Sequence, residues 1–381
     1  MLVAGTIATV LILAGCSDAG EVDSGAGSGD DGDFRIEGVP TLAELVKGSE
    51  GQPPSTSPPP AKGKNVWWIS CGQSSQSCAG YARAAEEAGK ALGWNFHIAD
   101  GNLNRASGYS TAIRTALAAK PDAIVLSSFS CDLVRQPLEE AKAQGVLVIG
   151  STTIDCADTG GPKLFTADNM YSEAMKTQPD YWRTIGRTHA QYVMNESRGT
   201  AKIIVNFGKG DPQQDFLNNA FLDELKKCSG CQVVDTVTWT TTDLTPNGPW
   251  ITAFRSSLVR HPEATHVFMP FEQLIGSQGG AQAIRESGRK LVGFGGLGAA
   301  EAIDVVRDGN WTAISAARSP EWIQWATIDN LNRALNGQPP VPQGVGFVVI
   351  DKDNNMPPQP RTNYQTAVDF KAAYKKAWGV G

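Results

Sequence analysis

The sequence has few of the residues and motifs on which common hydrolytic and metal-dependent catalysis depends. It contains 4 histidines in 381 residues and has no Gly-x-Ser-x-Gly, HExxH or Walker-type phosphate loop. Asp211 and Asp215 fall at the expected start of a helix, where carboxylates more often cap the backbone than catalyse. We therefore predict that the chain is not an enzyme, binds no metal and uses no cofactor.

Excess charge of one sign and a membrane-length apolar run are also absent. The chain has 33 basic and 39 acidic residues, a net charge of −6, and its basic residues are scattered. A nucleic-acid-binding surface would need clustered Lys and Arg, so no nucleic-acid partner is expected. The apolar run at the N-terminus is too short to span a bilayer, which requires about 20 residues.

That short N-terminal run is typical of a signal peptide. It ends in Leu13-Ala14-Gly15-Cys16, which resembles the lipobox of bacterial lipoproteins, in which the cysteine receives lipid. No Lys or Arg precedes Arg35, a departure from the usual positive start of such peptides. We predict a signal peptide over residues 1–15, lipidation at Cys16, and a position on the outer face of the cell membrane, held there by the lipid alone.

The next segment, residues 16–63, has the composition of a tether. Gly, Ser and Asp dominate its first part, and Pro-Pro-Ser-Thr-Ser-Pro-Pro-Pro occupies residues 53–60. Such a composition buries too little apolar area to offset the entropy of ordering the chain. We expect a flexible linker with at most a short helix around residues 42–46.

The remaining six cysteines suggest disulfides, because an even number in an exported chain is typical of them. Six cysteines allow 15 connectivities, and proximity favours Cys71 with Cys78, Cys131 with Cys156, and Cys228 with Cys231. Zinc or redox chemistry at the last pair is the alternative. No second ligand pair stands at zinc-like spacing, and this CxxC follows a helix rather than opening one, which disfavours both.

From residue 64 onward, short apolar runs alternate with segments of helical periodicity. This pattern predicts two doubly wound α/β units with parallel sheets. The about 310 residues involved also suit two domains. The expected strands are 66–70, 94–99, 123–127, 146–150, 164–167, 202–207, 231–239, 266–269, 290–294, 311–317 and 346–350.

Several phrases in this region resemble one family. They include Pro121-Asp-Ala-Ile-Val-Leu-Ser127, Glu140-Ala-Lys-Ala-Gln-Gly-Val146, Ala167-Asp-Asn169 and Leu291-Val-Gly-Phe294. In this order and spacing they are similar to type I periplasmic solute-binding proteins, the ribose- and galactose-type sugar binders of ABC importers. The resemblance implies two Rossmann-like lobes joined by a three-crossing hinge. One lobe would span 64–168 plus 318–344, and the other 169–317 plus 345–381.

The resemblance also implies a function. A monomer of this family closes its lobes on a small molecule and delivers it to the transmembrane permease of an ABC transporter. The alternative is a sensory receptor subunit that presents the same closed form to a signalling partner. A LacI-type regulator would need a helix-turn-helix where this chain has a signal peptide and tether.

At the positions of the family's pocket this sequence departs from the pattern. Thr152-Thr153 stands where an Asp-Arg pair is common, Phe271-Glu272 replaces Asn-Asp, and the hinge Gln falls on Ala317 or Arg318. Most of the groups that grip a pyranose are thereby lost, so we expect a ligand with an apolar or aromatic face and a few polar groups. The candidate contacts are Ser75, Ser128, Phe129, Thr152, Thr153, Phe207, Gln213, Asp215, Trp239, Phe271, Glu272, Phe294, Arg318 and Trp322.

Three further features have simpler interpretations. Gly293 to Gly298 fits GxGxxG, but the acidic residue that a dinucleotide site needs about 20 positions later is absent. Residues 351–362 begin like a calcium loop but lack its Gly and Glu. His189 is expected on the packed face of a long helix.

Overall fold

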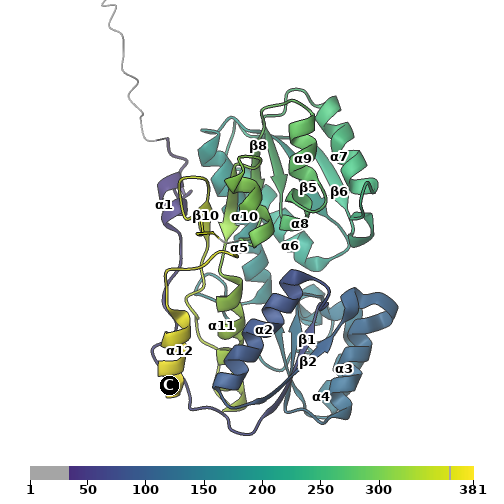
Figure 1. Ribbon diagram of the computed structural model, residues 1–381, viewed down its shortest axis with the longest axis vertical. Helices are drawn as coiled ribbons and strands as arrows, with labels where there is room; N and C mark the ends of the chain where they lie inside the picture. The colour runs from purple at the N-terminus through teal and green to yellow at the C-terminus, as the bar shows by residue number, and fades with distance from the viewer. Residues whose placement is uncertain (1–33, 360–361) are drawn as a thin grey trace, which may run out of the picture. The chain divides into compact units, whose positions relative to one another are not determined.

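The computed structural model describes residues 34–359 and 362–381. The predicted signal peptide and Cys16 lie outside these ranges. Residues 35–381 form one compact unit that contains two separate β-sheets (Figure 1). Within the described residues, every helix is too short or too polar to cross a bilayer.

The first sheet has four parallel strands in the order β2-β1-β3-β4. Its strands are β1 (Asn65–Ser70), β2 (Asn95–Asp100), β3 (Ala123–Ser127) and β4 (Leu147–Ser151). Alternate residues of each strand enter different hydrophobic clusters, as the period of a strand requires. Val66 and Val125 share a cluster with the alanines of α2, whereas Ile69 and Ile124 pack with Ile113 of α3.

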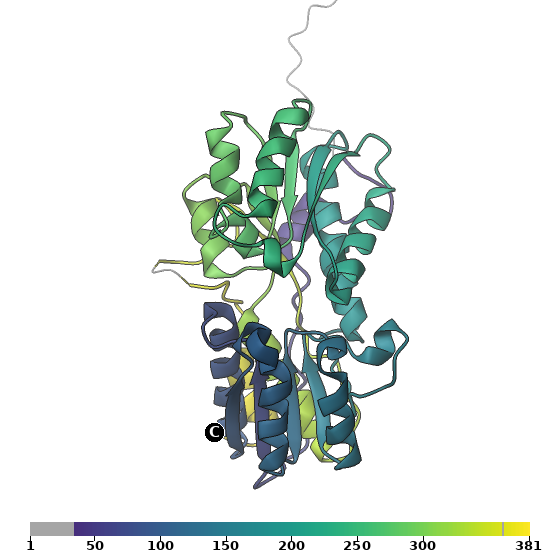
Figure 2. The ribbon, with the colours of Figure 1, turned by 90° about the vertical axis from the view of Figure 1, so that its right-hand side faces the viewer.

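Helices therefore cover both faces of this sheet. The helices concerned are α2 (Gln76–Ala91) and α11 (Pro320–Leu335) on one face, with α3 (Gly108–Ala118) and α4 (Arg135–Ala143) on the other. Figure 2 shows the same arrangement from the side. A parallel sheet buried on both faces explains why its strands are continuous apolar runs in the sequence.

The second sheet has six strands in the order β10-β9-β8-β7-β5-β6, all parallel except β10. The strands are β5 (Lys202–Gly208), β6 (Gln232–Trp239), β7 (His266–Met269), β8 (Val292–Gly295), β9 (Ala313–Ala317) and β10 (Val348–Ile350). One face packs on α5 (Gln178–Glu196) and α6 (Pro212–Leu225). The other packs on α7 (Pro249–Arg260), α9 (Gly280–Glu286) and α10 (Ala300–Arg307).

The remaining elements are short. They are α1 (Leu42–Lys47), α8 (Glu272–Ile275), α12 (Phe370–Trp378) and the 3-10 helices η1 (Asn102–Ser107), η2 (Cys131–Val134), η3 (Cys156–Thr159) and η4 (Thr241–Asp243). The predicted two-lobed α/β fold is confirmed, and ten of the expected strands are present within a residue or two of their expected ends. The strand expected at 164–167 is wrong. Thr166 and Ala167 both donate to one carbonyl, that of Val148, so no ladder forms.

A buried polar network joins the first sheet to the connections between the lobes. Ser151 Oγ at the end of β4 donates to Gln324 Oε1 of α11 at 2.7 Å. Asn169, in the first connection, donates to Thr327 Oγ1 at 2.8 Å and to the carbonyl of Gly150 at 3.0 Å. In the last connection the backbone of Gln343 donates to Tyr171 at 3.0 Å. Each crossing is thus tied to the others by hydrogen bonds.

The C-terminal helix α12 packs on the first lobe, not on the second as expected from the sequence. Trp325 of α11 stacks on Trp378 with ring centroids 5.5 Å apart, and Trp322 stacks on Phe370 at 5.7 Å. Figure 1 shows α12 beside α11. The chain after β10 therefore returns across the hinge, and only residues near β10 belong to the second sheet.

The second half of the predicted tether is a bound segment, which we call the N-terminal strap (residues 41–61). Its short helix α1 agrees with the expected helix and is closed by a capping box between Thr41 and Glu44. Val46 accepts a hydrogen bond from Asn355 at 2.7 Å, and Gly51 donates to the carbonyl of Gly344 at 2.8 Å. The strap therefore runs from the second sheet to the hinge.

Beyond the hinge, the strap lies on α11 of the first lobe. Ala61 donates to Asn332 Oδ1 at 3.0 Å, and Asn332 Nδ2 donates to the carbonyl of Pro58 at 3.0 Å. Composition predicted flexibility because the strap buries little apolar area. The prediction failed here because backbone and side-chain hydrogen bonds, not an apolar core, hold the segment in place.

Asp329 of α11 is the centre of a fully buried polar cluster. Its Oδ1 accepts from Ser57 of the strap at 2.6 Å and from Trp378 Nε1 at 2.8 Å. Its Oδ2 accepts from Arg333 Nε at 2.8 Å and from Gln343 Nε2 at 2.9 Å. Four donors satisfy the buried charge, as burial of a carboxylate requires. The Asp329 side chain of α11 therefore connects the strap, the last hinge connection and α12.

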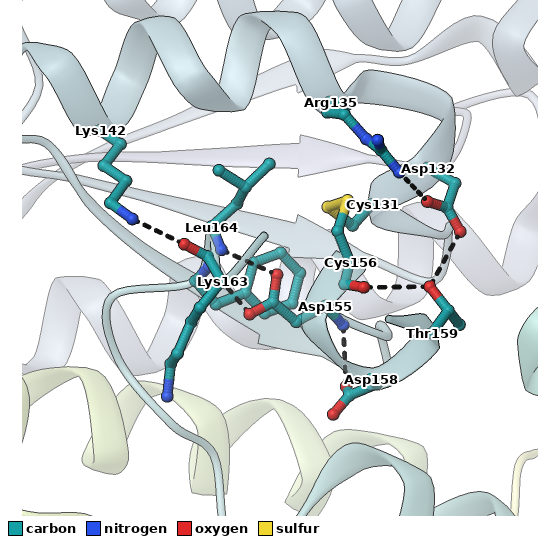
Figure 3. Close-up of a disulfide and its surroundings, with 11 residues drawn as sticks. Cys131, Asp132, Arg135, Lys142, Asp155, Cys156, Asp158, Thr159, Lys163 and Leu164 are labelled. Atoms are coloured by element: carbon teal, nitrogen blue, oxygen red, sulfur yellow. Dashed lines mark hydrogen bonds and ion pairs between the residues drawn. A yellow bond between two sulfur atoms is a disulfide. The ribbon is translucent and has the colours of Figure 1, made fainter. Parts of the chain in front are cut away.

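The three disulfides have the connectivity that proximity favoured: Cys71–Cys78, Cys131–Cys156 and Cys228–Cys231. Figure 3 shows Cys131–Cys156, which joins the segments that follow β3 and β4. Asp155 beside it accepts from the backbone of Leu164 at 3.0 Å. The sulfurs and this carboxylate lie close together, but both sulfurs are bonded to each other and offer no thiolate to a metal.

Candidate functional site

The carboxyl ends of the parallel strands are where open α/β sheets bind ligands. In the first sheet, β3 and β4 end side by side in register, Ser127 opposite Ser151. Ser128 Oγ lies 2.9 Å from Thr152 Oγ1, and the Ser128 backbone donates to Thr153 Oγ1 at 3.0 Å. The structure brings these three predicted residues together.

Two of these residues hold a backbone conformation that non-glycine residues rarely adopt. The φ angles of Ser128 and Thr152 are 62° and 53°. Such a conformation costs about 1–2 kcal/mol for an L-residue and is frequent at binding sites. The strand ends of the first lobe are therefore shaped by tertiary contacts rather than by local preference.

Phe129, the next candidate, is a core residue instead. Its ring stacks on Tyr109 with centroids 3.9 Å apart, and it is buried in the cluster beneath α3. Ser75 precedes α2 and is partly exposed, and its side chain makes no capping hydrogen bond.

Three more predicted aromatics belong to packed cores. Phe207 and Phe294 pack around Phe221 of α6 in the second lobe. Trp322 is fully buried between α11 and α12, and its Nε1 donates to Tyr374 at 3.2 Å. Aromatic residues are the largest core-formers, and their positions in the sequence gave no means of separating this role from ligand contact.

The aromatic group at the carboxyl edge of the second sheet consists of Trp182, Phe271 and Trp239. Phe271 follows β7 and contacts Trp182 and Trp239 edge to face, at 6.3 and 6.1 Å between centroids. Trp182 is 5% exposed, and its Nε1 has no hydrogen-bond partner among the described residues. Trp182 was not among the predicted contacts, because the helical period identifies a buried side and not an unpaired donor.

The start of α6 contributes polar groups from the same edge. Asp211 Oδ1 accepts from the backbone of Gln213 at 3.0 Å and so caps the helix. Burial first, and then the charge of Asp215, raise the pKa of Asp211. Gln213 is buried with its Nε2 unpaired within the described residues, whereas Asp215 is exposed.

Tyr109 of the first lobe and Asp211 of the second affect each other electrostatically. Burial, and then the carboxylate of Asp211, raise the pKa of the Tyr109 phenol to about 12. The start of α6 therefore faces the first lobe near α3.

Glu272 has a structural role rather than a free carboxylate. Its Oε1 accepts from the backbone of Leu297 and, at 3.1 Å, from that of Ala299. It thereby holds the glycine loop that follows β8. Gly295 in this loop has a φ of 128°, and a Cβ there would collide with the carbonyl of Met269, so close packing accounts for this position of the GxGxxG motif.

Arg318 lies at the end of β9, against that loop. Its Nε donates to the Tyr181 hydroxyl at 2.6 Å and its Nη1 to the carbonyl of Leu297 at 2.7 Å. It is 4% exposed. Burial opposes its charge, but Tyr181, Tyr81 and Glu272 outweigh burial and raise its pKa. The guanidinium is therefore a buried cation at the lobe-facing edge.

His189, as expected, packs within the second lobe and not at this edge. It is fully buried, and its Nδ1 lies 2.7 Å from Ser315 Oγ. Burial, and then the charge of Arg318, lower its pKa to about 3. A neutral imidazole with a hydroxyl partner is a core residue rather than an acid or base.

A separate cavity of about 180 Å³ lies between α2, the start of α11 and the segment after residue 362. Tyr81, Glu87 and Lys371 are among the residues that line it. Lys371 Nζ pairs with Glu87 at 2.7 Å and with Glu321 at 3.2 Å, so three of the charged groups at this cavity pair with one another.

Comparison with known proteins matches the chain to one family model. The model, described as a periplasmic binding protein domain, matches residues 60–339. No curated protein matches the sequence.

Solved structures share the fold at low sequence identity. The 5-methylthioribose transporter solute-binding protein of Thermotoga lettingae has a TM-score of 0.63 and 15% identity, covering 86% of this chain and 100% of its own. The periplasmic ribose ABC transporter protein of Conexibacter woesei has a TM-score of 0.62 and 19% identity, covering 77% and 93%.

A third structure is the periplasmic binding protein of the arabinose ABC transporter from Shewanella sp. ANA-3. Its TM-score is 0.59 and its identity 17%, over 82% of this chain and 95% of its own. The family model covers well over half of the sequence, and the two-sheet architecture agrees with these structures. The chain therefore belongs to the periplasmic binding protein domain family, in its type I form.

Proposed function

We propose that this chain captures a small solute between its two lobes and delivers it to the permease of an ABC transporter. The proposal is supported by family membership and by the unpaired buried groups at the carboxyl edge of the second sheet. An unpaired buried polar group costs about 1–3 kcal/mol, so a protein retains such groups where a ligand satisfies them. In this proposal the protein only binds its solute, and contacts of the solute with both lobes stabilise the closed form.

The ligand we propose has one apolar face and several polar groups. Trp182, Phe271 and Trp239 supply an aromatic surface, and Gln213 supplies an amide. Ser128, Thr152 and Thr153 supply hydroxyls from the first lobe. The three solved relatives are described as proteins of 5-methylthioribose, ribose and arabinose transport, so sugars and sugar derivatives belong in any screen.

A thermal-shift screen of the purified chain tests solute capture. A ligand at 100 times its dissociation constant should add about 2.7 kcal/mol to the free energy of unfolding. Trp182→Ala should abolish the shift, whereas Val259→Ala, at an exposed position on α7, should leave it unchanged. If sugars, polyols, aromatic acids and amines all leave the midpoint unchanged, the proposal fails.

We also propose that the mature protein is a monomer held at the outer face of the membrane by lipid on Cys16. The lipobox-like sequence supports this assignment. Cys16→Ser should move the protein from the membrane fraction to the soluble fraction without changing its melting temperature. Retention of the variant in the membrane fraction would contradict lipid anchoring. Light scattering of the soluble form should give the mass of one chain.

A further inference from the structure

Arg318 is a buried cation whose protein partners are all neutral. Its two hydrogen bonds go to the phenol of Tyr181 and to the carbonyl of Leu297. Among the residues that the structure describes, no carboxylate oxygen lies within 4.0 Å of its guanidinium, and its Nη2 makes no hydrogen bond. Taking a cation out of water without an anion costs several kcal/mol. The charge of Glu272 favours this cation without contacting it, so an anion that reached the open edge of the guanidinium would be its first direct anionic partner.

The carboxylate that acts on Arg318 through its charge is held by other groups. Glu272 acts on Arg318 through its charge, but its Oε1 is occupied by the backbone groups of Leu297 and Ala299. Its position is set by the loop that it holds. The protein therefore holds the guanidinium through its Nε and Nη1, which bond to Tyr181 and Leu297. Its Nη2 has no hydrogen-bond partner among the described residues.

The groups around Arg318 are also mainly donors. Tyr181, which fixes the guanidinium, touches the ring of Trp182 edge to face at 5.2 Å between centroids. Trp182 Nε1 is an unpaired donor, as is Gln213 Nε2 on the neighbouring helix α6, in the described part of the chain. Three unused N–H groups at one sheet edge match a ligand with strong acceptors.

Acceptors are present in the same region for hydroxyl groups of a ligand. The amide oxygens of Gln214 and Asn218, on the first turns of α6, are buried and have no partner within the described residues. Both are neutral, so they accept from hydroxyls without repelling a nearby anion. The edge thus combines a cation for one end of a ligand with amides for its hydroxyls.

Resting on the proposed solute capture, we propose that the ligand carries a carboxylate, bound by the free edge of Arg318 with the Trp182 indole as a second donor, next to hydroxyl groups. A small hydroxylated carboxylic acid has this chemistry. A planar guanidinium is the residue best matched to a carboxylate, because its fork donates two parallel hydrogen bonds. A neutral sugar offers no negative charge to pair directly with the guanidinium of Arg318.

The test compares neutral and acidic forms of the same carbon skeleton. Ribose and ribonate, arabinose and arabinonate, and galactose and galactonate are titrated into the wild-type chain by calorimetry and thermal shift. We expect at least one acid to bind at least tenfold more tightly than its neutral partner. Arg318→Gln should weaken that acid at least tenfold and leave any binding of the neutral partner unchanged, and Arg318→Lys should restore part of the loss.

A second measurement distinguishes a ligand-binding role from a structural one without any ligand. If Arg318 serves the ligand, Arg318→Gln without ligand should melt close to the wild-type temperature, because no carboxylate loses a partner and the Gln amide can still donate a hydrogen bond. A melting temperature several degrees lower would assign Arg318 to the structure and overturn the inference. The same follows if neutral sugars bind as tightly as their acids, although solute capture would then stand. A panel in which no compound binds would remove both proposals.

Discussion

Two buried arginines at opposite ends of α11 differ in how their charges are satisfied. Arg333, in the last turn, is 6% exposed and its Nε lies 2.8 Å from Asp329 Oδ2. Arg318, just before the first turn, is 4% exposed and bonds only to neutral groups within the described residues. A structural cation is paired by the protein itself. Arg318 lacks a direct anionic partner among the described residues, and the proposed carboxylate ligand would supply one.

Removing the paired arginine should have the largest effect. Arg333→Met leaves the Asp329 carboxylate buried without its counter-ion, and this should lower the free energy of unfolding by about 3–5 kcal/mol. The matched control, Arg318→Met, should cost less, about 1–3 kcal/mol for its hydrogen bonds to Tyr181 and Leu297, because no carboxylate loses its partner. Urea unfolding followed by tryptophan fluorescence measures both. Equal losses of unfolding free energy in the two variants would contradict the conclusion that only Arg333 is paired with a carboxylate by the protein.

The second prediction concerns pH and the buried His189, which lies near Arg318. Its folded pKa of about 3 is below the ordinary value of 6.5, so below pH 6.5 the unfolded chain takes up a proton that the folded chain does not. This group should therefore cost about 1.4 kcal/mol of stability per pH unit below 6.5, or about 2 kcal/mol at pH 5.

His189→Gln keeps a hydrogen-bonding group for Ser315 and cannot titrate. The difference in stability between pH 7 and pH 5 should be about 2 kcal/mol smaller in this variant than in the wild type. Melting curves across this range measure the difference. Identical pH profiles would show that the imidazole takes up a proton without unfolding, despite its burial.

The third prediction tests how much the hydrogen bond from Ser57 of the strap to Asp329 contributes to stability. Ser57→Ala removes one of the four donors to Asp329 and should cost about 1.5 kcal/mol, the usual contribution of a hydrogen bond to a charged group. Ser55→Ala, at an exposed strap position, is the matched control. Limited proteolysis should cut the Ser57 variant faster within residues 50–60. If both variants behave like the wild type, the strap is not held by Asp329.

The smallest effect on stability is expected at Trp182. Trp182→Phe keeps the ring and removes an indole N–H that has no partner in the described part of the chain. Stability should stay the same or rise by up to about 1 kcal/mol, because a buried unpaired donor is lost. Affinity for the ligand should fall by contrast. A loss of stability would indicate that the indole N–H is bound within the protein.

The sequence predicted the fold well because parallel strands buried on both faces are continuous apolar runs in the sequence. The runs at 123–127 and 202–207 could only be strands covered by helices, and both are. Two disulfides followed from short separations in the chain, and Cys131–Cys156 from the expectation that the strands before these cysteines are neighbours. The strap was missed because its stability comes from hydrogen bonds to Asp329 and Asn332, which lie about 270 residues away in the sequence.

The site was predicted less well, for a physical reason. Phe129, Phe294 and Trp322 follow or flank strand ends as ligand contacts do, yet their rings fill cores. Trp182 was missed because only its surroundings reveal an unpaired N–H. Arg318 was predicted as a ligand contact, and only the structure reveals that its charge has no direct anionic partner in the described residues.

The cluster around Asp329 also constrains the order in which the chain can reach its final state. Ser57 precedes Asp329 in the chain, whereas Trp378, another donor to the same carboxylate, follows it and is synthesised later. The first lobe can therefore not be completed before α12 has been synthesised. A product truncated by premature termination would lack α12, expose the aromatic face of α11, and be recognisable to proteases as unfinished.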